Sequence, residues 1–279
     1  MSRTPSRLVA LWCWYHGTRF RGYQAQADAV TVQATLKAAL LKAGLERSPV
    51  ASGRTDAGVH ARMLVLSLRV LDGGPLDELP GRINAHLPGD LGIALARPAP
   101  AHFNAQWRSR VKEYRYRLLT GARPDWAPFG WPVEVDPTRL EGVLRRAVGT
   151  FDYSAFHDPS SAVKPRTIRA IEVARGRDGL VDVRVRGEGF GRYMVRSLVG
   201  AAVAVARAEW SVDGFEAALA SGSSAEGLDS PGRPSRRFRA PAAGLTLWNV
   251  EYDAVDDPFT AEERRTAQGL PLAPPFVED

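Results

Sequence analysis

Segments with the pattern of β-strands outnumber helical segments in both halves of the chain, and this excess of strands limits the possible folds. In the first half, residues 8–15 form a continuous apolar run and residues 63–70 alternate leucines with other side chains, as expected for buried strands. Apolar residues at helical spacing predict a helix at 32–43, which Gly44 ends. A short helix and a third strand are expected at 76–84 and 91–96.

A proline-containing segment at 97–106 separates this half from a second one of about the same size. The second half begins with a long strand at 112–120, which places Tyr114 and Tyr116 on one face. Further strands are expected at 167–175, 180–186 and 244–253, and helices at 137–148, 191–209 and 212–221.

We therefore expect two α+β subdomains, at 1–107 and 108–255, followed by a proline-rich tail at 256–279. The predicted fold class is α+β: two α/β subdomains whose mainly antiparallel sheets join into one extended sheet, with helices packed on one face. The two halves share no obvious sequence repeat, so this expectation rests on the order of the elements alone.

The chain is basic, with a net charge of +6 and a pI of about 9.8. Such a balance favours a polyanionic partner, because cations that neutralise phosphates release counterions. Arginine supplies most of the positive charge, since the chain has only four lysines. A bias in composition explains the same excess, so charge alone leaves nucleic-acid binding open.

The single cysteine, Cys13, excludes an internal disulfide and a cysteine-rich metal site. The polar N-terminal residues lack the apolar core of a signal peptide, and no stretch approaches the ~18 apolar residues of a membrane span. We therefore expect a cytoplasmic protein with no membrane partner.

The string GRTDAGVHA at 53–61 carries the clearest chemistry in the chain. Two glycines flank the Arg-Thr-Asp step, so the backbone can follow a tight path and present the carboxylate of Asp56 at a cleft. The small side chain of Ala57 leaves room for a ligand. Most loop aspartates only cap a turn, and the spacing alone is compatible with either role.

The same string resembles the signature loop of the TruA family of tRNA pseudouridine synthases. The similarity runs along most of the chain, through the strings YHGTRFRGYQ at 15–24, NAHLPGD at 84–90, KEYRY at 112–116, FGRYMVRSLVG at 190–200 and PAAGL at 241–245. His16 and Tyr23 depart from the family pattern, which usually has aspartate and tryptophan at these two places.

The resemblance implies the pseudouridine synthase fold and an enzyme that isomerises uridine to pseudouridine at positions 38, 39 and 40 in the anticodon stem-loop of tRNA. It implies Asp56 as the nucleophile, Tyr114 against the target uracil, Arg196 as an active-site cation and Leu245 at the catalytic cleft. A homodimer that binds tRNA is implied as well.

This isomerisation breaks the N-glycosidic bond and rejoins the uracil through carbon, so we expect neither a cofactor nor a metal. Asp56 could attack the sugar, attack the base or remove a ribose proton, and the sequence leaves these alternatives open. A carboxylate in a cleft that excludes water needs a cation to stay ionised, and Arg196 is the candidate. The ring of Tyr114 could hold the flipped uracil, while Arg54 could fill the gap that the base leaves or hold its phosphate.

Arg19, Arg21 and Arg192 are weaker candidates for RNA contacts, because a solvated arginine is as common as one on a phosphate.

Two other classes of protein fit parts of the pattern. A non-catalytic RNA-binding module of similar fold would expose aromatic residues on a sheet but would not need the loop around Asp56. A glycoside or nucleoside hydrolase usually places two carboxylates around the bond, and no acidic partner for Asp56 stands out in the sequence.

Overall fold

The structure is a computed structural model that describes residues 6–71, 74–221, 234–266 and 268–277. The chain divides into two compact units. Unit 1 comprises Met1–Arg110 and Leu247–Val277, and unit 2 comprises Val111–Thr246 together with the last two residues.

The sheet of unit 1 is antiparallel around a buried central strand. Strand β1 (Arg7–Tyr15) pairs with β3 (His60–Val70) on one side and with β4 (Leu91–Pro98) on the other, and the short β2 (Val50–Ala51) pairs with β3. The strand order is β4-β1-β3, with β10 (Leu245–Glu251) beside β3. All but one residue of β3 are buried, and so are most residues of β1, including Val9–Cys13. Both faces of these strands are therefore covered, which explains the continuous apolar run at 8–15 in β1.

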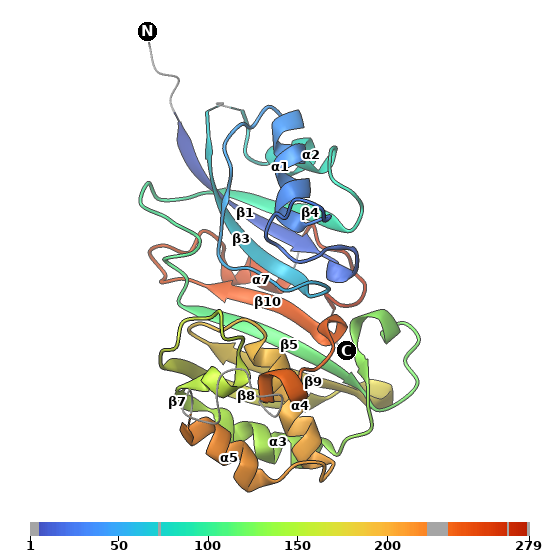
Figure 1. Ribbon diagram of the computed structural model, residues 1–279. Helices are drawn as coiled ribbons and strands as arrows, with labels where there is room; N and C mark the ends of the chain where they lie inside the picture. The colour runs from blue at the N-terminus through green and yellow to red at the C-terminus, as the bar shows by residue number, and fades with distance from the viewer. Residues whose placement is uncertain (1–5, 72–73, 222–233, 267, 278–279) are drawn as a thin grey trace. The chain divides into compact units, whose positions relative to one another are not determined.

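Helix α1 (Val32–Lys42) forms where the apolar periodicity predicts it. Val32, Leu36 and Leu40 are buried at a spacing of four residues, and the Thr31 side chain accepts a hydrogen bond from the Ala34 N–H at its N-terminus. Gly44 follows the helix with φ +78°, a conformation that ends helices at little cost only for glycine. The shorter α2 (Leu79–Asn84) lies beside α1 and packs on β4 (Figure 1).

The sheet of unit 2 has the strand order β5-β9-β8-β7, and its neighbours along this order are antiparallel. These strands are β5 (Val111–Leu119), β7 (Gly149–Phe151), β8 (Arg166–Arg175) and β9 (Leu180–Gly187), with the short β6 (Trp131–Pro132) parallel to β5. Helices α3 (Pro137–Leu144) and α4 (Met194–Ala206) pack against each other and against this sheet (Figure 1). Helices α5 (Val212–Ser221) and α6 (Pro234–Arg237) contact α4. All but one residue of α4 are buried, so this helix forms the core of unit 2.

The predicted α+β class, with mainly antiparallel sheets and helices packed against them, is confirmed. Every long strand and helix expected from the sequence forms within a few residues of its predicted position. The expected helix at 191–209 is shorter at both ends, because Tyr193 leaves the helical conformation and Arg207 caps the C-terminus.

The structure groups the last part of the chain with the first part. Residues from Leu247 to Val277 belong to unit 1, and they include a short helix, α7 (Ala261–Thr266), that the sequence patterns did not indicate. Phe259 and Phe276 are 3 % and 4 % exposed, with ring centroids 5.7 Å from Trp12 and 5.8 Å from Trp14 respectively. These two phenylalanines of the tail are therefore part of the core of unit 1.

Candidate active site

Asp56 lies in unit 1, in the loop that joins β2 to β3, and its side chain is half-buried. The carbonyl of Asp56 accepts a hydrogen bond from the Val59 N–H at 3.2 Å, which closes a turn at Ala57 and Gly58. Gly58 has φ +79°, and its N–H donates to the Phe20 carbonyl at 3.2 Å. The loop thus turns sharply just after the carboxylate.

Residues on both sides of Asp56 are tied to the end of β1 and to the segment that follows it. The Tyr15 hydroxyl and the Thr55 Oγ1 are 2.8 Å apart in a buried hydrogen bond, and the Tyr23 N–H donates to the Thr55 carbonyl at 3.0 Å. On the other side, the Gly17 N–H donates to Nδ1 of the fully buried His60 at 3.0 Å. The backbone that carries Asp56 is therefore held at both ends, as a preorganised catalytic group requires.

Two glycines let the segment at 17–22 approach the Asp56 loop closely. A Cβ on Gly17 would lie 2.0 Å from the Val59 carbonyl oxygen, well inside van der Waals contact. Gly22 has φ +95°, and a Cβ there would lie 3.0 Å from the Thr55 carbonyl oxygen. Both positions therefore require glycine, one for space and the other mainly for its backbone conformation.

We expect Gly17→Ala to lower the free energy of unfolding by about 2–3 kcal/mol, because the new methyl group must displace backbone atoms. Gly81→Ala is the matched control. A Cβ on this helical glycine meets no atom within 4 Å, so alanine should raise stability by about 0.5–1 kcal/mol. Urea unfolding of both variants measures the difference, and equal stability of the two would contradict this account of the loop.

Arg54 is exposed, and its Nη1 donates to the Gln24 Oε1 at 2.8 Å. This bond links the Asp56 loop to the segment at 15–24 from the solvent side. Arg19 is also exposed and forms a two-pronged ion pair with Asp90, with both N–O distances at 2.8 Å, whereas Arg21 is exposed on the same segment.

The two residues that depart from the family pattern pack inside unit 1. Tyr23 is 3 % exposed, and burial raises the pKa of its hydroxyl. The ring of His16 lies 4.9 Å from that of Phe276, and burial lowers the pKa of its imidazole although Asp90 opposes this shift. The segment NAHLPGD has a structural role as well, since the Asn84 side chain exchanges two hydrogen bonds with the backbone of Ile93 at the start of β4.

Tyr114 lies in unit 2 on β5, on the same strand face as Lys112 and Tyr116. It is half-buried, and its ring meets that of Phe190 edge to face at 5.2 Å between centroids. Tyr116 is fully buried and donates its hydroxyl to the Pro241 carbonyl at 2.7 Å. The two tyrosines therefore differ: Tyr116 belongs to the core, whereas Tyr114 is partly accessible.

Arg196 lies on the first turn of α4, and its Nε donates to the Ala240 carbonyl at 2.8 Å. Burial raises the pKa of the Tyr116 hydroxyl, and the nearby charge of Arg196 offsets this shift in part. Arg196 and Tyr116 donate to the carbonyls of the adjacent residues Ala240 and Pro241, so Arg196 lies near the face of β5 that also carries Tyr114.

Leu245 is 5 % exposed and begins β10, directly after a 3₁₀ turn at Ala242–Gly244. A Cβ on Gly244 would lie 2.7 Å from the Tyr116 ring, so this turn packs directly on the tyrosine. Within unit 2 the structure thus gathers the Tyr114 face of β5, Arg196 and the PAAGL string. In unit 1 it gathers Asp56 and Arg54 with the string at 15–24.

Lys112 shares the strand face of Tyr114, and burial lowers the pKa of its ammonium group to about 8. Below pH 8 the lysine is charged in both the folded and unfolded protein, so the folded state bears the full cost of desolvation. This free-energy cost decreases as the pH rises from 8 towards the ordinary pKa of lysine, because Lys112 loses its proton in the folded protein before it does so in the unfolded protein.

We therefore expect Lys112→Met to raise the free energy of unfolding at pH 7 by about 1–3 kcal/mol, a range discounted for the partial exposure of the side chain. The gain should disappear by about pH 10.5. Urea unfolding of wild type and variant from pH 7 to 10.5 tests this, and a gain that is constant with pH would rule out the titration of Lys112 as its cause.

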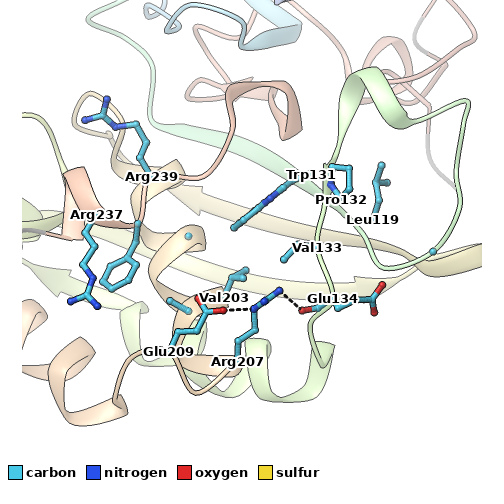
Figure 2. A pocket seen from close by; sticks show the side chains of 14 residues that line it. Leu119, Trp131, Pro132, Val133, Glu134, Val203, Arg207, Glu209, Arg237 and Arg239 are labelled. Carbon is cyan, nitrogen blue, oxygen red and sulfur yellow. Dashed lines mark hydrogen bonds and ion pairs between the residues drawn. The ribbon is translucent and has the colours of Figure 1, made fainter.

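A pocket of about 690 Å³ opens in unit 2 beside the second half of α4 (Figure 2). It is lined by Leu119, Gly121 and residues 131–134 of the β5–β6 region, by the second half of α4 and the residues just after it, and by residues 237–239. At one end, Arg207 bonds to Glu209 at 2.6 Å and to the Glu134 carbonyl at 3.3 Å. Tyr114, Arg196 and Leu245 do not line this pocket.

Within the described residues, no group of three or more His, Cys, Asp or Glu side chains could hold a metal ion. In the same part of the chain, no helix has the length and apolar content needed to cross a membrane.

Comparison with known proteins agrees with the resemblance seen in the sequence. A family model described as tRNA pseudouridine synthase matches residues 143–253. The chain is 37 % identical to tRNA pseudouridine synthase A of Halalkalibacterium halodurans over 78 % of this chain and 86 % of that protein. It is 34 % identical to the tRNA pseudouridine synthases A of Bacillus licheniformis and Pelobacter propionicus, covering 86 % and 88 % of this chain and 96 % and 100 % of those proteins.

The chain belongs to the tRNA pseudouridine synthase family. It is an isomerase that forms pseudouridine in tRNA, and both the family and the enzyme class predicted from the sequence are confirmed. A solved structure described as a Cbf5-Nop10-Gar1 complex aligns with a TM-score of 0.35 and 16 % identity over 70 % of this chain and 44 % of that chain, a likeness too weak to support any conclusion.

The structure draws attention to one residue of this tRNA pseudouridine synthase that the sequence analysis did not single out. Tyr193 precedes α4 with φ +66°, and three arginine side chains approach its ring. The adjacent Arg192 and Tyr193 indicate that a cation could stack on the tyrosine ring. No local signal in the sequence indicates the left-handed backbone of Tyr193 or the contact of Arg239 with its ring.

Proposed function

We propose that this enzyme isomerises uridines at positions 38, 39 and 40 in the anticodon stem-loop of tRNA, with Asp56 as the catalytic carboxylate. The proposal rests mainly on the anchoring of the GRTDAGVHA loop. Hydrogen bonds of Thr55 on one side and of His60 on the other hold the backbone that carries Asp56. The target positions follow from the resemblance of this loop to that of the TruA family.

The reaction exchanges one bond of the uracil for another. The bond from the ribose C1′ to N1 breaks, a bond from C1′ to C5 forms, and the proton on C5 leaves while N1 gains one. Asp56 acts as nucleophile or as a base on the sugar, and Arg196 keeps its carboxylate ionised. The half-buried ring of Tyr114 holds the flipped uracil, and its hydroxyl carries the C5 proton. Leu245 supplies an apolar wall for the base.

The exposed arginines supply the affinity for tRNA in this proposal. Arg54 contacts the strand from which the target base is flipped, and Arg19, Arg21 and Arg192 contact phosphates along the stem. The resemblance further favours a homodimer that binds tRNA, and the cytoplasm as the compartment in which the enzyme meets it. No cofactor takes part.

The test uses tRNA transcripts with tritium on the uracil C5, in which each of positions 38, 39 and 40 is in turn the only uridine of the anticodon arm. The wild-type protein should release tritium from all three transcripts, and nucleoside analysis should find pseudouridine at the same positions. Pseudouridine formed only outside the anticodon arm would contradict the proposed target while leaving the enzyme class intact.

A further inference from the structure

Three guanidinium groups of unit 2 converge on the ring of Tyr193. The guanidinium carbon of Arg239 lies 3.7 Å from the ring centroid, that of Arg192 at 4.7 Å and that of Arg196 at 5.5 Å. Arg192 and Tyr193 precede α4, Arg196 lies in its first turn, and Arg239 follows α6. We call Arg192, Tyr193, Arg196 and Arg239 the Tyr193 cluster.

The backbone of Tyr193 adopts the left-handed conformation, with φ 66° and ψ −4°. This conformation is strained for a bulky residue, and such strain concentrates at functional sites. The Tyr193 carbonyl accepts hydrogen bonds from the Ser197 N–H at 2.9 Å and the Ser197 hydroxyl at 3.1 Å, so it begins α4. A glycine would meet these backbone needs without strain, which leaves the aromatic ring as the reason for a tyrosine here.

Hydrogen bonds from Nε to backbone carbonyls hold the side chains of Arg239 and Arg196, and a bond from its own backbone N–H holds the main chain at Arg192. Nε of Arg239 donates to the Ser235 carbonyl at 3.1 Å, and Nε of Arg196 donates to the Ala240 carbonyl at 2.8 Å. The backbone N–H of Arg192 donates to the Ser161 hydroxyl at 2.9 Å. A guanidinium has five N–H donors, so an Nε bond fixes its position without exhausting its capacity.

Three guanidinium carbons of the cluster lie within 5.5 Å of one ring centroid. Asp158 brings one carboxylate near the cluster: burial raises the pKa of this carboxyl, but hydrogen bonds from Ser160 and the charges of Arg192 and Arg239 outweigh burial and lower it. The contact of each guanidinium with the ring face offsets part of the repulsion among the cations. An oxyanion between the arginines would offset more, and guanidinium groups bind phosphate oxygens in two-pronged geometry.

We propose that Arg192 and Arg239 form one binding site for a backbone phosphate of the tRNA, and that Tyr193 is a positioning residue that aligns their guanidinium groups. The inference rests on the proposed function, because that function supplies the RNA. It adds a contact point beside Arg196, so a phosphate bound here would lie close to the residue assigned to the active site. Arg192 is exposed and Arg239 half-buried, so both can reach a ligand from solvent.

The salt dependence of tRNA affinity tests the site. At about 0.1 M salt, Arg192→Met and Arg239→Met should each weaken binding of a tRNA transcript about 5- to 10-fold. Each should also reduce the slope of log affinity against log salt by about 0.7–0.9, the loss of one phosphate contact. Arg237→Met is the matched control, since Arg237 stacks singly on Phe238 at 4.8 Å and its guanidinium points away from that of Arg239 (Figure 2). Its slope should equal that of wild type.

Variants of Tyr193 separate positioning from folding. Tyr193→Phe keeps the ring and should bind tRNA like wild type. Tyr193→Gly relieves the backbone strain and removes the ring, so it should retain the thermal stability of wild type while losing affinity and slope like Arg239→Met. Wild-type affinity of Tyr193→Gly would overturn the positioning role.

Two further outcomes distinguish this inference from the function on which it rests. Suppose that wild type binds tRNA and that Arg192→Met, Arg239→Met and Arg237→Met all keep its salt slope, or all reduce this slope equally. The phosphate site is then wrong and the proposed function stands. If wild type does not bind tRNA at all, the proposed function fails and the site fails with it.

Discussion

Replacement of Asp56 by asparagine or alanine is expected to lower the single-turnover rate of pseudouridine formation by at least about 10⁴-fold, the scale of losing a covalent nucleophile. Only a carboxylate can supply the nucleophile or base, whereas affinity for tRNA comes from phosphate contacts spread over the surface. The measurement is tritium release from C5-labelled tRNA at saturating enzyme, with tRNA affinity measured in parallel.

A matched control for this prediction is Asp28→Asn, which removes the charge of an exposed loop aspartate in the same unit and should leave the rate unchanged. The Asp56→Asn protein must be checked by mass spectrometry, because deamidation would restore aspartate. Turnover by an intact asparagine variant within about 100-fold of wild type would exclude the catalytic role of Asp56, since loss of the nucleophile lowers the rate by far more than this.

In the proposed function Arg196 pairs with the catalytic carboxylate, so Arg196→Met is expected to lower the rate at pH 7 by about 10²- to 10³-fold, the scale of removing one partner of a buried ion pair. Methionine keeps much of the length and apolar packing of arginine but removes the cation. Without that cation the catalytic carboxyl should keep its proton to higher pH, so the rate should recover in part as pH rises. Single-turnover rates from pH 6 to 9 at saturating enzyme measure this profile.

Two comparisons keep this result interpretable. Arg196→Lys should be intermediate, because it retains the charge and loses the two-pronged geometry. A lost phosphate contact would instead appear as a shallower salt dependence of tRNA affinity with an unshifted pH profile. A Met variant that is slower by the same factor at every pH would exclude the ion-pair role of Arg196.

Local patterns predicted the secondary structure well, because their causes lie within a few residues. The helix expected at 32–43 forms as α1, with Thr31 and Gly44 at its two ends. The leucine alternation at 63–70 lies within β3. The same local character limits these patterns: the left-handed conformation of Tyr193 shortens α4, and no propensity indicates a positive φ at a tyrosine.

The burial of aromatic residues of the tail at 256–279 could not be predicted from local sequence patterns. The prolines of the tail indicate a surface segment, yet Phe259 and Phe276 pack on Trp12 and Trp14 of β1. Aromatic residues are buried wherever the fold offers an apolar partner. Here that partner is more than 200 residues away in the chain, so the contact depends on the assembled sheet.

For the site, the sequence by itself determined the chemical groups: the string around Asp56, the tyrosine-bearing strand, the arginine of α4 and, through them, the family. Only the tertiary structure decided what holds these groups. Tyr15 meets Thr55 across 40 residues of sequence, and Gly17 meets His60 across 43. Arg239, which follows α6, lies over the ring of Tyr193. Side-chain identity is a property of the sequence, whereas these distances arise only when strands and helices distant in sequence pack together.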